Sequence, residues 1–378
     1  NASGQLAPAA NTGNSFADFL LGIPTSGQVA GLQPFHYRYT EIFPYVQDSW
    51  KARRDLTINW GLSWYHSTVP NPQGADAKIP HAFNFQTGLL EYAALGEVSP
   101  QVIKPDYKNW TPRFGIAWQP SFLKNTVVRA GIGVYYETGA LIESQFDMVA
   151  PPFQPSLSIT NNQFQPLPTY TLGQNTFPII SLAPLTPGFA ATLPQGFTPF
   201  AVAEDSKLPY ITQWNFSIQH TLRASDLVEL DYTGTSGHRQ QNRYDVDQCQ
   251  VSSTGFCDPA TRPYPRYNYI LYSNTNGNLN YEALIARYQH QFSHGLTVMA
   301  NYTFSKTITD GWEGGGSTQS QIATCRSCDR GLVSYDVPHH FVVSTVYQLP
   351  FGHGRTFASN WNRMGDSLVG GWQVNAIA

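Results

Sequence analysis

The stretch 56–64 alternates residue by residue between apolar and small polar side chains. Leu56, Ile58, Trp60, Leu62 and Trp64 share one phase, and Thr, Asn, Gly and Ser residues share the other. Because successive side chains of a strand point to opposite sides of a sheet, this period of two predicts a β-strand with one apolar and one polar face. Its length matches the roughly 9–11 residues with which a tilted strand crosses a lipid bilayer.

The same alternation recurs along the chain and predicts about ten strands. They are expected at 37–50, 56–66, 110–119, 126–137, 209–222, 227–234, 282–292, 296–307, 339–349 and from near 371 onward. The alternation is clean in most of these segments and weaker in 37–50 and 339–349. The apolar segment 16–23, inside a Gly-, Ala- and Ser-rich opening, predicts a short loop helix.

The connections between these segments alternate between short and long. The short ones lie near 51–55, 121–125, 223–226 and 293–295, and the long ones near 67–109, 138–208, 235–281 and 308–338. This alternation is typical of outer-membrane barrels, which have short periplasmic turns and long extracellular loops. Loops this long would be unusual inside a compact soluble domain. The connection near 350–367 departs from the rule, since its position in the order predicts a short turn.

The amino-acid composition suits a β-sheet that has lipid on one side and water on the other. Charged residues make up only 12% of the 378 residues and aromatic residues 14%, with a mean hydropathy of -0.29. Few charges and many uncharged polar residues fit strands with a lipid face and a water face. A net charge of -3 gives no reason to expect a nucleic-acid partner. The sequence therefore predicts an all-β, antiparallel, up-and-down transmembrane barrel whose partner is the bilayer.

The phase of each strand divides its residues between lipid and lumen. We expect Trp60, Leu62, Trp214, Phe216, Val298 and Tyr302 to face lipid, and Asn59 and Thr303 to face the lumen. Charged and amide side chains on the polar phase are further candidates for the lumen, where charge is tolerated. These are Arg113, Arg129, Gln213, Asn215, Glu229, Asp231, Arg287 and Asn301. They either contact a plug inside the barrel, line a solute path or are simply solvated by water in the lumen.

Aromatic residues gather near the predicted strand ends, as in the interfacial girdles of membrane barrels. They are Trp50, Trp64, Tyr65, Trp110, Trp118, Tyr135, Tyr136, Tyr302 and Phe304. The alternative is that aromatic residues favour strands in general.

The four cysteines form two local pairs in the predicted long loops, Cys249 with Cys257 and Cys325 with Cys328. An even number of cysteines with local spacing predicts two disulfides in an oxidising compartment. The spacing Cys-Arg-Ser-Cys also fits a redox motif or half of a zinc site, but no second Cys-x-x-Cys or His pair accompanies it.

No motif for catalysis or cofactor binding is present, and we expect no enzyme, cofactor or metal site. The sequence has no phosphate-binding loop, no His-Glu-x-x-His and no Gly-x-Ser-x-Gly. Asp245 and Asp247 could begin a calcium loop, but the glycine and closing glutamate are missing, so solvated loop carboxylates are the better interpretation. His339 and His340 are neighbours on a strand and face opposite ways, which disfavours joint metal ligation.

Twelve short stretches resemble the barrel of TonB-dependent outer-membrane receptors of the Oar-like group. They are FADFLLG (16–22), YVQDSWK (45–51), LTINWGL (56–62), TPRFGIAW (111–118), VVRAGIGVYY (127–136), PYITQWNFSIQ (209–219), LDYTGTSGH (230–238), NYEAL (280–284), FSHGL (292–296), ANYTFSK (300–306), YDVPHHFVVS (335–344) and LPFGHGR (349–355). They cover most of the chain outside the long loops, in a fixed order.

The resemblance implies a bacterial outer-membrane location and a full barrel of about 22 strands around a plug. The plug, the TonB box and the terminal strand have no counterpart in 1–378, so we expect part of one barrel domain, with 1–36 as a lead-in. The resemblance also implies import of a large or scarce solute, a carbohydrate, peptide or metal chelate, with the TonB complex acting through the plug. A passive porin or structural surface barrel, and a soluble secreted all-β binding protein, are the alternatives.

Overall fold

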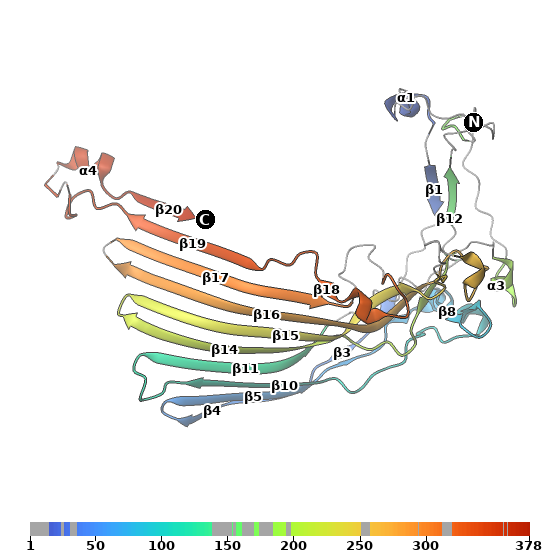
Figure 1. Cartoon of the computed structure of the whole chain (residues 1–378), viewed down its shortest axis with the longest axis horizontal. Coiled ribbons are helices and arrows are strands. Elements are labelled where there is room, and N and C mark those ends of the chain that lie inside the picture. Colours follow the sequence, from blue (N-terminus) through green and yellow to red (C-terminus); the bar gives the residue numbers. More distant parts are fainter. Residues whose placement is uncertain are drawn as a thin grey trace.

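The computed structural model describes residues 15–23, 26–30, 36–137, 153, 156–160, 170–173, 184–193, 198–250, 258–293, 295–311, 320–357, 359–360 and 362–378. Ten strands in these residues form one curved sheet in which each strand pairs antiparallel with the next along the chain (Figure 1). They are β4 (Tyr45–Arg53), β5 (Leu56–Trp64), β10 (Trp110–Trp118), β11 (Thr126–Tyr136), β14 (Tyr210–Arg223), β15 (Asp226–Asp245), β16 (Leu271–Ser293), β17 (Leu296–Thr309), β19 (His339–Gln348) and β20 (Gln373–Ile377). The predicted all-β class and antiparallel order are confirmed.

The sheet is open. The pairing runs from β20 at one edge to β4 at the other, and in the described residues these two edges do not pair with each other. Two short strands join the sheet from the loops: β18 (Gly331–Leu332) pairs antiparallel with β17, and β13 (Phe200–Val202) pairs with β16 in parallel. The expectation of antiparallel pairs throughout is therefore wrong for β13, because this strand comes from a long loop and does not continue the up-and-down wall.

All four predicted short turns lie at one end of the sheet, which we call the short-turn end, and the long connections lie at the other, the long-loop end (Figure 1). The connection between β19 and β20 also lies at the short-turn end and carries helix α4 (Arg363–Val369). Asn362 caps this helix by accepting the Gly365 N–H at 2.9 Å. A short helix thus explains why this turn is longer than the pattern predicts.

Strand boundaries depart from prediction at the long-loop end. The segment 37–50 is interrupted: only β4 joins the sheet, and β2 (Tyr37–Arg38) and β3 (Glu41–Ile42) pair with β7 (Asn71–Pro72) and β6 (His66–Ser67). Strands β15 and β16 run on to Asp245 and from Leu271, so the predicted loop 235–281 shrinks to 246–270. These extensions have no lipid to face, which is why they lack an alternating apolar phase.

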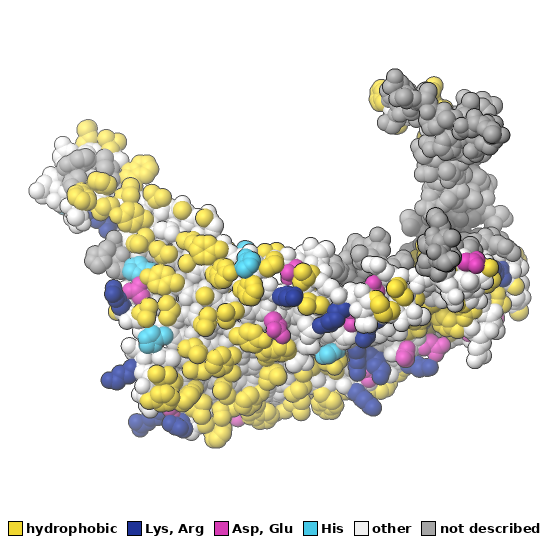
Figure 2. All heavy atoms as spheres, in the orientation of Figure 1, with side chains coloured by type: hydrophobic (Ala, Val, Ile, Leu, Met, Phe, Trp, Pro, Cys, Tyr) yellow, Lys and Arg dark blue, Asp and Glu magenta, His cyan; other side chains and the backbone are white. Residues whose placement is uncertain are grey.

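Cross-strand register divides the sheet into two faces. Trp60, Phe114, Ile132 and Trp214 are successive cross-strand partners, and partners share a face. This apolar face carries all six residues expected to face lipid, and hydrophobic side chains spread across the sheet in Figure 2. Along β17 its apolar side chains run from Leu296 to Phe304, about 27 Å of strand at ~3.4 Å per residue. Nine residues are about the number with which a tilted strand crosses the apolar band of a membrane barrel.

An aromatic row crosses the apolar face near the long-loop end. Trp64 pairs with Trp110, and Tyr136 pairs with Tyr210, with ring centroids 6.5 Å and 5.4 Å apart. The expected girdle was wrong for two residues. Tyr65 is buried among the loops, and Tyr135 lies in the opposite phase of β11.

The long loops are packed against one another, and they hold the hydrophobic core of the described residues. One cluster joins Tyr92, Phe189 and Ile270 from three different long connections, and a second is built around Tyr65 and Ile103. The loop elements are β8 (His81–Asn84), β9 (Leu89–Tyr92), α3 (Phe189–Thr192) and the 3-10 turns η1 (Gly74–Lys78), η2 (Ala93–Leu95), η3 (Pro259–Thr261) and η4 (Arg326–Asp329). At this end of the sheet, the apolar side chains of the loops are buried against one another rather than facing lipid.

Asp245 and Asp247 organise the loop 246–270 from inside. Asp247 is fully buried, accepts the Tyr264 N–H at 2.6 Å and lies 3.5 Å from Nη1 of Arg262. Asp245 accepts the N–H groups of Asp247 and Ile270, each at 2.9 Å. The interpretation of these residues as solvated carboxylates was wrong, since they supply acceptors for loop N–H groups that water does not reach.

The remaining elements lie off the main sheet. Helix α1 (Ser15–Leu20) overlaps the predicted helical segment 16–23, and β1 (Ser26–Ala30) pairs with β12 (Ser156–Thr160). Cys325 and Cys328 are joined in a disulfide within the connection from β17 to β19. Cys257 lies outside the described residues, so its pairing with Cys249 stays a prediction. Among the described residues no helix is long and apolar enough to cross a membrane.

Candidate functional site

The eight charged and amide residues expected in the lumen all lie on one face of the sheet, opposite the apolar face. Register shows this directly: Arg113 pairs with Gly133 and Gly133 with Gln213, while Arg129, Ser217 and Asp231 are successive partners. We call this side, which carries Arg113, Arg129, Gln213, Asn215, Glu229, Asp231, Arg287 and Asn301, the polar face. That this face lines a lumen stays a prediction.

One part of the polar face is closed by its own interactions. Arg287 on β16 donates from Nη1 to Glu229 and from Nε to Asn301, each at 3.0 Å, and so joins three neighbouring strands. Arg129 donates to the side-chain oxygen of Gln219 at 2.7 Å. These contacts tie Arg287, Glu229 and Arg129 to their neighbours, whereas Oδ1 of Asp231 is buried without a hydrogen-bond partner among the described residues.

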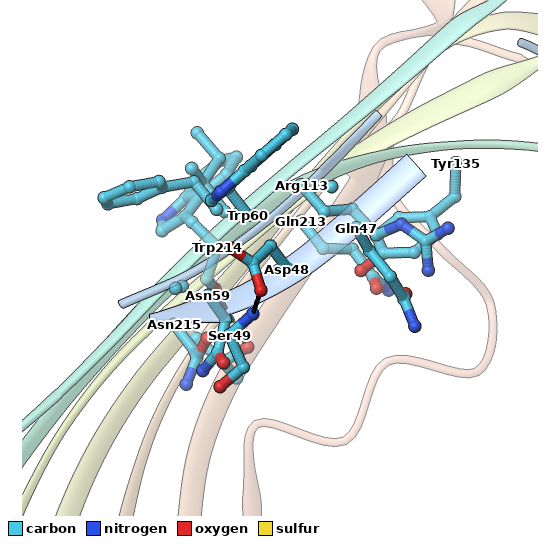
Figure 3. Close-up of a pocket in the computed structure, with 17 residues that line it drawn as sticks. Gln47, Asp48, Ser49, Asn59, Trp60, Arg113, Tyr135, Gln213, Trp214 and Asn215 are labelled. Atoms are coloured by element: carbon cyan, nitrogen blue, oxygen red, sulfur yellow. Dashed lines mark hydrogen bonds between the residues drawn. The ribbon is translucent and has the colours of Figure 1, made fainter. Parts of the chain in front are cut away.

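The other part of the polar face, over β4, β5, β10, β11 and β14, forms a hollow of about 750 Å³ that we call the polar groove. Figure 3 shows Trp60 and Trp214 on one side of the strands and Gln47, Arg113 and Gln213 on the other. The residues that line it are mainly amides, hydroxyls and glycines, including Gln47, Ser49, Asn59, Gln213, Asn215 and Thr233. Arg113 is the one charged side chain of this lining on the polar face, since Asp48 is the cross-strand partner of Trp60 and belongs to the apolar face.

Glycines form the floor of the polar groove. Gly61, Gly115, Gly131 and Gly133 come from three adjacent strands and leave the backbone bare. At Gly131 a Cβ would lie 2.7 Å from Oδ1 of Asn215, so the missing side chain is what lets this amide lie across the strand. The groove therefore exists because these glycines leave space between the larger side chains of the same face.

Tyr135 is the aromatic residue of the lining that lies on the polar face, since Trp60, Phe114 and Trp214 lie on the apolar face. A Cβ at Gly133 would lie 2.8 Å from its Oη, so the ring extends over Gly133, and the guanidinium of Arg113 lies 5.9 Å from the ring centroid. Tyr135 also lines a second hollow of about 280 Å³ at the long-loop end, with Glu137, Ile211 and Gln240. It thus connects the loops with the polar groove.

Sequence reasoning found Arg113, Gln213 and Asn215 but missed Tyr135 as part of the site. The alternation of β11 could have placed Tyr135 on the polar face, because it falls on the same side of the strand as Arg129, Gly131 and Gly133. The stretch 127–136 contains two of the floor glycines, Gly131 and Gly133, and only the strand pairing adds Gly61 and Gly115 to them. Gln47 lies in a segment whose alternation is weak.

The arrangement can bind but offers no obvious machinery for catalysis. Amide side chains both donate and accept hydrogen bonds, and the groove is open on the polar face. In the part of the chain that the structure describes, no three His, Cys, Asp or Glu side chains are grouped to hold a metal ion.

Comparisons with known proteins agree with the fold. The family model described as the outer membrane beta barrel domain matches residues 1–378. No curated protein sequence matches this chain.

Solved structures that are similar include the outer membrane transporter YddB from Escherichia coli, at 12% identity and a TM-score of 0.46, covering 82% of this chain and 31% of that one. The siderophore receptor PirA from Pseudomonas aeruginosa has 14% identity, a TM-score of 0.35 and coverage of 82% and 43%. The FrpB iron transporter from Neisseria meningitidis has 10% identity, a TM-score of 0.40 and coverage of 91% and 38%.

The chain spans less than half of the length of each of these three structures. The match over the whole of 1–378, together with a sheet that has one apolar and one polar face, identifies the chain as a member of the outer-membrane β-barrel domain family, located in the bacterial outer membrane.

Proposed function

We propose that this chain forms part of the wall of a TonB-dependent receptor that imports a large or scarce solute and performs no bond chemistry on it. The observation that carries the proposal is the open sheet of ten wall strands, apolar on one face and polar on the other. Ten strands with the gentle curvature of Figure 1 correspond to less than half of a barrel of about 22 strands, the size that holds a plug.

The two edges of the sheet support the same proposal. Within the described residues β4 and β20 each pair with one strand only, and their other edges present bare N–H and C=O groups. Lipid does not tolerate unpaired backbone groups, so we propose further strands of the same wall beyond both edges, with 1–378 as part of one barrel domain. A plug inside that barrel would face the polar face.

The packed loops give the proposed receptor a place to meet its solute. Two clusters of buried side chains hold the long connections together, so their surface is shaped before a ligand arrives.

Uptake measured in cells that carry the full-length gene tests the proposal. Solute uptake by wild-type cells should be lost when TonB is deleted or when the proton gradient is collapsed. Uptake that persists in both cases identifies a passive porin and overturns the proposal. Recovery of the native protein in the aqueous phase without detergent would exclude a membrane barrel altogether.

A further inference from the structure

We propose that Tyr135 is a stacking platform for a sugar ring and that the polar groove binds an oligosaccharide. This inference rests on the proposed function, because it names the class of solute that passes the polar face. It is carried by the position of Tyr135 between the two hollows and by the chemistry of the residues around it.

The ring of Tyr135 is set as a platform. Its hydroxyl end lies over Gly133, where a Cβ would approach Oη to 2.8 Å and both Cε2 and Cζ to 3.0 Å. One side of the ring is thus supported by bare backbone. The residue is nevertheless 40% exposed, which leaves the rest of the ring open to the polar face.

The surroundings of the ring suit hydroxyl groups. Gln213 is the cross-strand partner of Gly133, and Gln47 and Arg113 lie on the same side of the sheet (Figure 3). A sugar ring has an apolar C–H side that packs on an aromatic ring, and hydroxyls at its edge that both donate and accept. Amides supply both kinds of partner at fixed positions, and Arg113 adds donors.

The charge of the groove argues against a metal chelate. Arg113 is the one charged side chain of the lining that lies on the polar face, because Asp48 is the cross-strand partner of Trp60 and belongs to the apolar face. One exposed guanidinium compensates only in part for the desolvation of a strongly charged chelate. A peptide chain could also use the amides, but a flat ring supported by glycine offers it no particular advantage.

Binding of labelled oligosaccharides to the full-length protein in detergent tests the inference. The probes are neutral gluco-, xylo- and galacto-oligosaccharides and an oligogalacturonate, which separates neutral from acidic sugars. At least one should bind. Tyr135→Ala should weaken that binding about tenfold, the equivalent of ~1.4 kcal/mol, and Tyr135→Phe should change it less than about twofold.

Two further variants make the test specific. Gly133→Ala should also weaken binding, because its Cβ displaces the ring while the tyrosine remains. Tyr232→Ala, on the apolar face, is the matched control and should bind as the wild type does. No binding by any probe, or equal binding by wild type and Tyr135→Ala, overturns the inference. The inference also fails if Tyr135→Ala leaves sugar binding unchanged and speeds protease release of a domain held inside the barrel. Tyr135 would then pack against protein.

The two proposals fail separately. Sugar binding is measured on purified protein without TonB, whereas import is measured in cells. TonB-dependent uptake with no Tyr135-dependent sugar binding leaves the receptor in place and removes the saccharide. Tyr135-dependent sugar binding with TonB-independent uptake keeps the saccharide site and removes the TonB-dependent receptor.

Discussion

At the residue scale, single side chains decide whether neighbouring strands can pack their large aromatics. Trp214 lies over its cross-strand partner Gly234 on the apolar face, where a Cβ would lie 2.3 Å from Cε2 of the indole. Glycine is required at this position by the ring above it and not by a positive φ.

We therefore expect Gly234→Ala to force Trp214 off the sheet and to lower the free energy of unfolding by about 1–3 kcal/mol. Gly115→Ala is the matched control, because its Cβ would meet only the Ala130 carbonyl oxygen at an ordinary 3.6 Å. Urea titration of the full-length protein in lipid vesicles, followed by tryptophan fluorescence, measures both. Equal stability of the two variants would contradict the role assigned to Gly234.

Two adjacent residues of β14 test the assignment of faces. Phe216 lies on the apolar face and Asn215 on the polar face. Phe216→Arg should cost about 2–4 kcal/mol of stability near the middle of the membrane, and Asn215→Arg should cost much less. The same urea titration compares them, and the reverse ranking would refute the assignment.

At the scale of elements, the alternation of side chains predicted the wall strands well. The pattern of 56–64 became β5 almost residue for residue, since lipid on one side and water on the other impose it. The stretch 235–245 showed no such pattern, and its strand was missed because it extends beyond the apolar band. The core of the loops was missed for another reason: Tyr92 and Ile270 meet from segments far apart in sequence, and no local pattern encodes that contact.

The polar groove was predictable only in part. The phase of Arg113 and Asn215 followed from their own strands. Their meeting with Tyr135 depends on the register between strands, which turn lengths of several residues leave open. Likewise, the sequence Asp-Val-Asp at 245–247 does not reveal that both carboxylates point into a loop.

The stability of the loop 246–270 against local opening should depend on Asp247. Asp247→Ala removes the acceptor of the Tyr264 N–H and the partner of Arg262, so we expect opening of the loop to become easier by about 1–3 kcal/mol. Asp247→Asn keeps an acceptor and should lose less. Hydrogen exchange of the amides of 258–270 measures this opening, and unchanged exchange in Asp247→Ala would contradict the interpretation.

The same carboxyl gives the loop a pH dependence. Burial raises the pKa of Asp247 above the ordinary value of 3.8 for an aspartate. Because the folded pKa is the higher one, the stability that protonation of Asp247 adds is fully present below pH 3.8 and is lost as pH rises through the raised pKa. Exchange of the loop should therefore show a pH-dependent opening in this window that Asp247→Asn lacks, and the same slope in both proteins would count against it.

At the scale of the whole molecule, we propose that the ten wall strands form part of a larger barrel. Chemical cross-linking in the full-length protein tests this: cysteines replacing Asp48 on β4 and Ala376 on β20 should not be joined by a short bismaleimide. Cysteines replacing Ser49 and Asn59, which are cross-strand partners on β4 and β5, should be joined efficiently. A cross-link between β4 and β20 would show that the sheet closes into a small barrel of its own.

The central claim is that one face of this sheet meets lipid and the other meets water. Single cysteines placed in turn at 213–218 of β14, in full-length protein in native outer membranes, test it directly. A lipid-soluble maleimide should label positions 214, 216 and 218, and a water-soluble one positions 213, 215 and 217, since the side chains alternate between the two faces. Labelling of all six positions by the water-soluble reagent, or labelling without a period of two, would contradict the account.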